Sequence, residues 1–140
     1  MAPDDSQPDD DARLRALDRE ACMRLVGERG VGRYVFRGDR GPVALPVNYA
    51  VVDGDLLFRT SPESGMAARV PDAPVSFEVD RWNESARSGW SVLITGRIQR
   101  VSEGSVPDSW SDGPVPWPVG DHSVLLRLIP FQVTGRVLAA

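Results

Sequence analysis

The chain has 140 residues, which is the size of one compact domain, and its 41% hydrophobic content is enough to build a core. Its 12 prolines and 13 glycines favour short strands and many turns over long helices. All 16 basic residues are arginine, so the chain has no lysine for Schiff-base chemistry, including the usual covalent linkage to pyridoxal phosphate, or for a Walker-type phosphate loop.

The net charge of −4 is concentrated at the N-terminus. Five of the 20 acidic residues are Asp4, Asp5, Asp9, Asp10 and Asp11, and without them 16 basic residues face 15 acidic ones. We therefore expect a disordered acidic tail over residues 1–12, and a single, nearly neutral domain over residues 13–140. A nearly neutral body argues against a nucleic-acid surface, which needs a basic stripe.

Nothing in the sequence points to a membrane. No apolar run approaches membrane-spanning length, and the N-terminus lacks the basic and apolar regions of a signal peptide. We therefore expect a cytoplasmic protein that does not bind membranes.

The first predicted element is a helix that begins after Asp18. Asp18 can cap it, and Leu17 and Cys22 have the spacing of a hydrophobic staple. Leu17, Ala21, Leu25 and Val26 fall on one face, and Gly30 can end the helix. Cys22 is interpreted as a buried structural thiol, because the only cysteine of the chain cannot form an internal disulfide.

After this helix the hydrophobic period changes to two, which indicates strands. The turn sequences Gly38-Asp39-Arg40-Gly41 and Asp53-Gly54-Asp55 predict hairpins. A short helix is expected over residues 61–70. An α+β, mainly β fold follows, a six-stranded antiparallel split β-barrel with short flanking helices. The expected strands are Arg33–Arg37, Val43–Val51, Asp55–Thr60, Val75–Arg81, Trp90–Val101, Ser123–Ile129 and a short final one at Gln132–Leu138.

The end of the third strand has groups that can bind phosphate. The guanidinium of Arg59 can hold two oxygens, and the hydroxyl of Thr60 adds a third donor. The competing interpretation is an exposed ion pair with a helix cap. Ser61 can either add a hydroxyl or cap the following helix, whose N-terminus favours an anion.

The order of several short motifs resembles the pyridoxamine-phosphate-oxidase-like FMN-binding split barrels of actinobacterial type. The resemblance covers roughly residues 18–137 and implies a dimeric flavin-binding barrel. The family includes oxidases, flavin reductases, nitro-reducing proteins, and members that bind other cofactors or none. The motifs are Gly32-Arg33-Tyr34-Val35-Phe36, Leu45-Pro46-Val47-Asn48-Tyr49, Phe58-Arg59-Thr60, Phe77-Glu78-Val79-Asp80, Ser88-Gly89-Trp90-Ser91-Val92 with Gly96-Arg97, and Val133-Thr134-Gly135-Arg136.

This resemblance implies a role for two further segments. The strand with Pro46, Val47, Asn48 and Tyr49 would pass along the flavin ring and offer backbone polar groups to its pyrimidine edge, although Tyr49 can equally fill the core. The segment Trp90-Ser91 would reach the cofactor from the opposite protomer, although Trp90 also suits an ordinary dimer interface.

The chain departs from the family at Gly65, where relatives commonly have a lysine five residues after the threonine of the Phe-Arg-Thr motif. The loss of one charge-assisted contact costs about 1.5 to 3 kcal/mol, so weakened FMN binding is expected. Arg69 lies one helical turn further on and could replace that charge.

Other polar residues give weaker indications. His122 is the only histidine, which excludes a His-based metal cluster and favours a surface or interface role over catalysis. Glu78 and Asp80 are expected to face solvent or to pair with arginine. Trp110 and Trp117 lie in the proline-rich segment 106–118, which can form a lid over a site.

The function expected from these observations is that of an FMN-binding, flavin-dependent oxidoreductase acting on a small molecule at a homodimer interface. Hydride transfer to flavin requires no catalytic base, so no catalytic residue is assigned. Two alternatives stay open. One is a non-enzymatic split-barrel binding module with lost or weakened flavin binding, which Gly65 favours; the other is a deazaflavin-dependent reductase.

Overall fold

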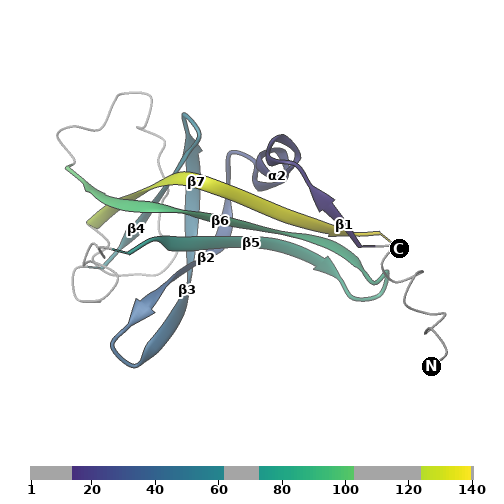
Figure 1. Ribbon diagram of the computed structural model, residues 1–140, viewed down its shortest axis with the longest axis horizontal. Helices are drawn as coiled ribbons and strands as arrows, with labels where there is room; N and C mark the ends of the chain where they lie inside the picture. The colour runs from purple at the N-terminus through teal and green to yellow at the C-terminus, as the bar shows by residue number, and fades with distance from the viewer. Residues whose placement is uncertain (1–13, 62–72, 103–123, 140) are drawn as a thin grey trace.

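The computed structural model describes residues 14–61, 73–102 and 124–139, which form one helix and seven strands (Figure 1). The strands make one antiparallel sheet in the order β1-β7-β4-β3-β2-β5-β6, and β6 also pairs with β7. Strands β2 to β7 therefore form a closed ring of six, as predicted, and β1 adds to β7 outside that ring. The elements are β1 (Leu14–Leu17), α2 (Arg19–Val26), β2 (Arg29–Gly38), β3 (Gly41–Val52), β4 (Asp55–Thr60), β5 (Val75–Asn83), β6 (Ser88–Val101) and β7 (Val124–Leu138).

Aromatic side chains fill the interior of the barrel. The Tyr34 ring lies 4.7 Å from that of Phe36 and 4.9 Å from that of Phe58, measured between centroids. Phe77 continues the cluster, 5.3 Å from Phe58 and 5.4 Å from Tyr49. The rings come from four strands of the barrel, so this one cluster ties the sheet together across its interior.

The helix begins where the sequence predicts and ends earlier. The Asp18 carboxylate accepts a hydrogen bond of 2.8 Å from the Ala21 amide, which confirms the N-cap. Helix α2 ends at Gly27, whose φ of 70° suits glycine, so the predicted stop at Gly30 is wrong. Cys22 and Val26 are buried, whereas Leu25 is 37% exposed, against expectation.

Gly30 lies in β2 and has a packing role there. A Cβ atom at this position would lie 2.7 Å from the hydroxyl oxygen of Tyr49, whose residue is its direct partner on β3. The glycine therefore gives the tyrosine ring room to cross it, a requirement that comes from strand pairing and not from a helix end.

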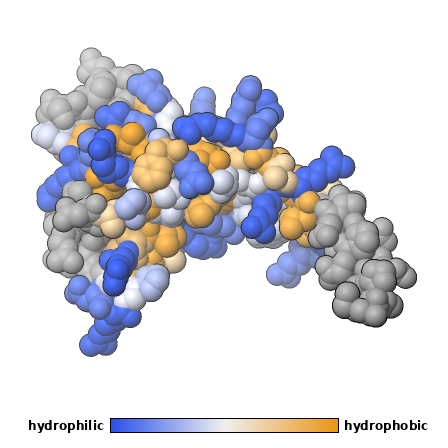
Figure 2. Space-filling model, viewed as in Figure 1, coloured by the Kyte–Doolittle hydropathy of each residue, from blue (hydrophilic) through white to orange (hydrophobic). Residues whose placement is uncertain are grey.

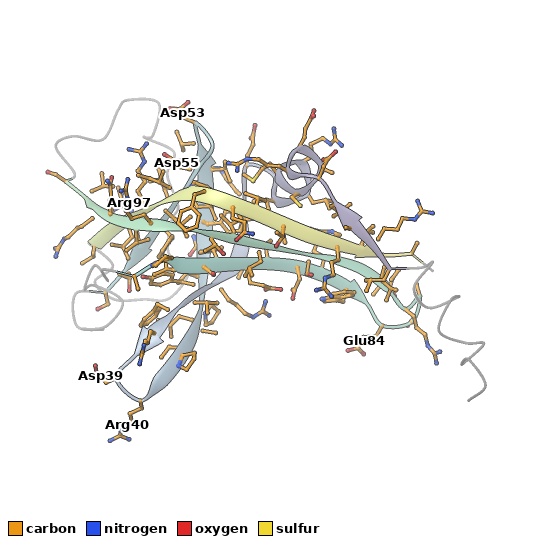
Figure 3. The ribbon with its side chains drawn as sticks, viewed as in Figure 1. Asp39, Arg40, Asp53, Asp55, Glu84 and Arg97 are labelled. Atoms are coloured by element: carbon orange, nitrogen blue, oxygen red, sulfur yellow. The ribbon has the colours of Figure 1, made fainter. Side chains whose placement is uncertain are left out.

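Both predicted hairpin turns are present. Asp53 and Gly54 have φ values of 53° and 84° between the paired residues Val52 and Asp55, as a two-residue hairpin turn requires. Gly38 pairs with Gly41, which leaves Asp39 and Arg40 at the tip of the long β2–β3 hairpin in Figure 3.

Strands β2 and β3 extend beyond their predicted bounds at both ends, and β5 and β6 at one end each. The two segments expected at Ser123–Ile129 and Gln132–Leu138 form the single strand β7. This strand pairs with β6 along most of its length and with β4 and β1 in turn. Strand β4 pairs with Val124–Leu128 and β1 with Gly135–Leu138, so Pro130 lies between these partners, where β7 is paired with β6 alone and the register with β6 shifts.

Several predictions concern residues outside the described part of the chain: the tail 1–12, most of the helix expected over residues 61–70, and the segment 106–118. Gly65, Arg69 and His122 also lie there. In the described part, no helix is long and apolar enough to cross a membrane.

Candidate functional site

The sheet opens between β3 and β4, at the residues that the sequence indicates. Pairing between these strands begins at the hairpin and ends at Tyr49 opposite Phe58, whereas β4 continues along β7 to Thr60 opposite Val124. The amide of Val51 donates to the Glu28 carbonyl at 2.8 Å, so the odd-numbered residues of β3 direct their backbone groups toward β2. The even-numbered Pro46 and Asn48 therefore direct theirs toward the opened edge.

Proline suits this position. Pro46 has no amide hydrogen and would leave a gap in a continuous ladder, but at an edge it removes no strand bond. The opened edge thus presents the Pro46 carbonyl and the amide of Asn48, whose carbonyl faces Arg59 at the last step of the ladder; these are the polar groups that could meet a planar heterocycle.

Strand alternation divides the predicted site residues between two faces of the sheet. Pro46, Asn48 and Arg59 point outward, away from the barrel interior. Val47 packs against the core, and Thr60 is buried with 7% exposure. Of the predicted phosphate-binding side chains, Arg59 is therefore on the outer face, Ser61 follows it at the strand end, and Thr60 is directed inward.

Tyr49 belongs to the core. It is 2% exposed, and its hydroxyl donates a hydrogen bond of 2.6 Å to the carbonyl of Val26 at the end of α2. Burial raises the pKa of Tyr49 to about 12. Only its backbone could therefore contribute to a site, which agrees with the core-filling alternative for its side chain.

Trp90 and Ser91 lie on β6, opposite Val137 and Arg136 of β7. Being consecutive, they point to opposite faces. Trp90 packs against the core, whereas Ser91 is on the outer face with Leu93. The structure therefore brings Ser91, and not the Trp90 ring, onto the face that carries Pro46, Asn48 and Arg59.

A charged cluster borders the opened edge. Arg33 lies opposite Pro46 on one side and Glu78 on the other. Its guanidinium is 2.9 Å from a Glu78 oxygen and 3.5 Å from an Asp80 oxygen, so both acidic residues pair with arginine, as predicted. Arg33 was not among the predicted site residues, although counting back from the Gly38–Gly41 turn places it beside Pro46.

The pKa values of Arg33 and Glu78 are both raised, which favours the charged form of the arginine and the neutral form of the glutamate. The charge of Asp80 and the hydrogen bond to Glu78 raise the pKa of Arg33. Burial and the neighbouring Asp80 also raise the pKa of Glu78, and they outweigh the opposing effect of Arg33. We attribute this to the sharing of one half-exposed cation by two carboxylates whose side chains are each only 25% exposed. The cluster adds negative charge to the border of the opened edge.

Known proteins that resemble the chain along most of its length share its fold. The "Uncharacterized protein Rv0080" of Mycobacterium tuberculosis is 32% identical over 129 residues, covering 88% of this chain and 85% of that protein. A putative pyridoxamine 5'-phosphate oxidase from Corynebacterium glutamicum has a TM-score of 0.72 at 22% identity, covering 91% of this chain and 94% of that one.

The FAD binding protein from Mycobacterium smegmatis has a TM-score of 0.66 at 24% identity, covering 89% of this chain and 98% of its own. The model of the family described as pyridoxamine 5'-phosphate oxidase matches residues 18–137, a range that contains all of the motifs named above. This chain belongs to the pyridoxamine 5'-phosphate oxidase family.

Proposed function

We propose that this protein binds FMN at the opened edge between β3 and β4 and acts as a flavin-dependent oxidoreductase on a small molecule. The observation that carries the proposal is the end of the β3–β4 ladder at Tyr49 and Phe58, beside the outward-facing Arg59. Family membership and a structural neighbour that is itself named an FAD binding protein support a flavin as the cofactor class.

The donor set of this edge fits an anionic heterocycle. Backbone groups of Pro46 and Asn48 can meet the polar edge of a ring, and the guanidinium of Arg59 with the hydroxyl of Ser61 can bind a phosphate. The flavin, when bound, supplies the redox chemistry. The residues of this chain hold and orient the flavin. The ion pairs with Glu78 and Asp80 keep the Arg33 guanidinium from moving toward the phosphate of FMN.

A second copy of the chain would complete this site. Val31 and Leu93 are 43% and 41% exposed, and they lie on the outer face beside Asn48 and Ser91. Burial of these apolar side chains in a homodimer would bring Ser91 of one protomer toward Arg59 of the other, so FMN binding and dimerisation would be coupled through mass action.

The absorption spectrum of the purified protein, before and after incubation with FMN or FAD, tests the proposal. We expect a flavin spectrum, saturation at one FMN per protomer, and reduction of the bound flavin by a nicotinamide donor. A colourless protein that binds neither flavin in calorimetry would contradict it and favour a non-enzymatic module. Binding of a deazaflavin instead would indicate the reductase alternative. Flavin binding without reduction by any donor would indicate a carrier.

Dimerisation has its own test. Leu93→Asp should yield a monomer in light scattering and weaken FMN binding by about tenfold or more, because it places a charge in the proposed interface. Gln99→Asp, further along the same strand, is the control and should change neither quantity. A Leu93→Asp monomer that binds FMN as tightly as the wild type would exclude a shared site.

The Gly65→Lys variant tests the departure from the family. The added cation should tighten FMN binding by about tenfold, whereas riboflavin, which has no phosphate, should gain little. The sequence predicts a helix at residue 65, where replacing glycine would also remove about 1 kcal/mol of propensity penalty, so the two ligands must be compared in the same variant. Equal gains for both, or no gain for FMN, would show that residue 65 does not contact the phosphate.

A further inference from the structure

A bulge between β6 and β7 creates a hollow on the outer face of the barrel. The register of these strands shifts between Thr95 and Gly96, and Gly96 then lies opposite Pro130. A Cβ atom on Gly96 would be only 2.1 Å from the Ile129 carbonyl oxygen, so the close approach of the two backbones depends on glycine. Pro130, which has no amide hydrogen, suits the irregular partner position.

The hollow has a volume of about 330 Å³, near the lower end of the range for small-molecule sites. Its wall is mostly apolar and includes two prolines and one aromatic ring. It is lined by Ala73, Pro74, Arg97, Ile129, Pro130 and Phe131. None of these residues belongs to the opened edge described above, so the hollow is a separate feature.

Phe131 is the most exposed large hydrophobic residue in the described part of the chain, at 60%. Figure 2 shows hydrophobic surface, bordered by hydrophilic side chains, over the barrel half of the molecule where β6 and β7 meet. An exposed phenylalanine at the rim of an apolar hollow gives a flat ligand a ring to stack against.

Arg97 supplies the one charge of the lining. It lies opposite Ile129, and its side chain makes no hydrogen bond or ion pair within the part of the chain that the structure describes. Figure 3 shows it on the barrel half of β6, at the opposite end of the strand from the turn that holds Glu84. A planar guanidinium that has no partner among the described residues, beside an apolar wall, matches a carboxylate in bidentate geometry.

We propose that this hollow binds a small aromatic carboxylate, with the ring system against Phe131 and the two prolines and the carboxylate on Arg97. The volume suits one or two fused rings, and the single cation selects an anion of one charge. The proposal does not depend on flavin binding, because it uses no residue of the flavin site.

Titration of the full-length protein with 2-naphthoate in calorimetry tests this, with 2-naphthamide as the neutral ligand of the same shape. We expect saturable naphthoate binding, and naphthamide binding weaker by about tenfold, since it lacks the charge-assisted pair. Arg97→Gln should remove this difference. Arg100→Gln, which changes another exposed arginine of β6 that does not line the hollow, is the control and should preserve it.

Phe131→Ala should weaken both ligands by a similar factor, because it removes the stacking surface and leaves the charge. Thermal unfolding of each variant must match that of the wild type for the comparison to hold, and Phe131→Leu replaces any variant that does not fold. No saturable naphthoate binding at millimolar concentration, or equal binding of the acid and the amide, would overturn the proposal. Loss of naphthoate binding at saturating FMN would also overturn the proposal, since the hollow would then be part of the flavin site. Loss of naphthoate binding when the protein dimerises would overturn it as well, because a second copy of the chain would then occupy the hollow.

Discussion

Two buried tyrosines of the same core should respond in opposite directions to the loss of their hydroxyl groups. Tyr34 and Tyr49 are 1% and 2% exposed, and both contact the phenylalanine cluster. The Tyr49 hydroxyl donates to the Val26 carbonyl, whereas that of Tyr34 has no hydrogen-bond partner among the described residues. The substitutions Tyr34→Phe and Tyr49→Phe therefore compare an unsatisfied hydroxyl with a satisfied one in one environment.

The expected magnitudes follow from the cost of burying polar groups. An unsatisfied buried hydroxyl costs about 1 to 3 kcal/mol, so Tyr34→Phe should raise the free energy of unfolding by about 1 kcal/mol. Tyr49→Phe removes a hydrogen bond and leaves the Val26 carbonyl without its donor, and should lower that free energy by about 1 to 3 kcal/mol. Urea unfolding at pH 7 measures both values, provided that the slope with denaturant is unchanged. A Tyr34→Phe variant that is less stable than the wild type by 1 kcal/mol or more would show that this hydroxyl has a partner in solution.

The same pair predicts an alkaline stability profile. Burial raises the pKa of Tyr34 and that of Tyr49 to about 12. An unfolded tyrosine ionises near pH 10 while the buried one keeps its proton, so the unfolded state gains stability between pH 10 and pH 12, by up to about 1.4 kcal/mol per pH unit for each residue. Stability should fall through this window in the wild type and fall less steeply in each single Phe variant. If the slope of the free energy of unfolding against pH is unchanged in both variants, neither tyrosine has a raised pKa in the folded protein.

Two further predictions concern contacts outside the aromatic cluster. Asp55→Asn should lower the free energy of unfolding by about 1 to 3 kcal/mol in the same urea assay. The reason is that it weakens the charge-assisted hydrogen bond of 2.6 Å that Nε of Arg127 donates to the largely buried Asp55 carboxylate. Asp53→Asn in the exposed turn is the control and should be nearly neutral. Gly135→Ala should lower the free energy of unfolding by about 1 to 3 kcal/mol, because the new Cβ would lie 2.6 Å from the Cys22 sulfur. Adding Cys22→Ala in a double-mutant cycle should recover about 1 kcal/mol of that loss. If the two substitutions act independently, the sulfur is not the obstacle.

Local signals in the sequence were sufficient for much of the fold. Asp18 caps its helix and Asp53-Gly54 forms its turn because both depend on bonds within a few residues. The ring of six strands followed from the period-two pattern and the family resemblance. Strand β1 was missed because it has four residues, is largely exposed, and is defined only by its pairing with the end of β7.

The errors came from residues whose roles depend on distant partners. Gly30 suits a helix end by local rules, but the ring of Tyr49 on the next strand decides its role. Leu25 fits the helical face by spacing, and yet the helix packs through Cys22 and Val26 instead. The interior pairing of Tyr49 with Val26 was also invisible in the sequence, since these residues are brought together only by the return of β3 along β2.

The candidate site shows why the sequence could indicate its residues but not its geometry. If the β3–β4 hairpin were extended from its turn, pairing would continue to Val47 opposite Thr60. In the structure it ends at Tyr49 opposite Phe58, while β4 stays paired with β7, on its other side, to Thr60 opposite Val124. Pro46 in a strand already indicated an edge, since it cannot complete a ladder. What makes that edge a candidate site is that β3 separates from β4 while β4 remains held by β7, and β7 lies more than 60 residues further along the chain than β4.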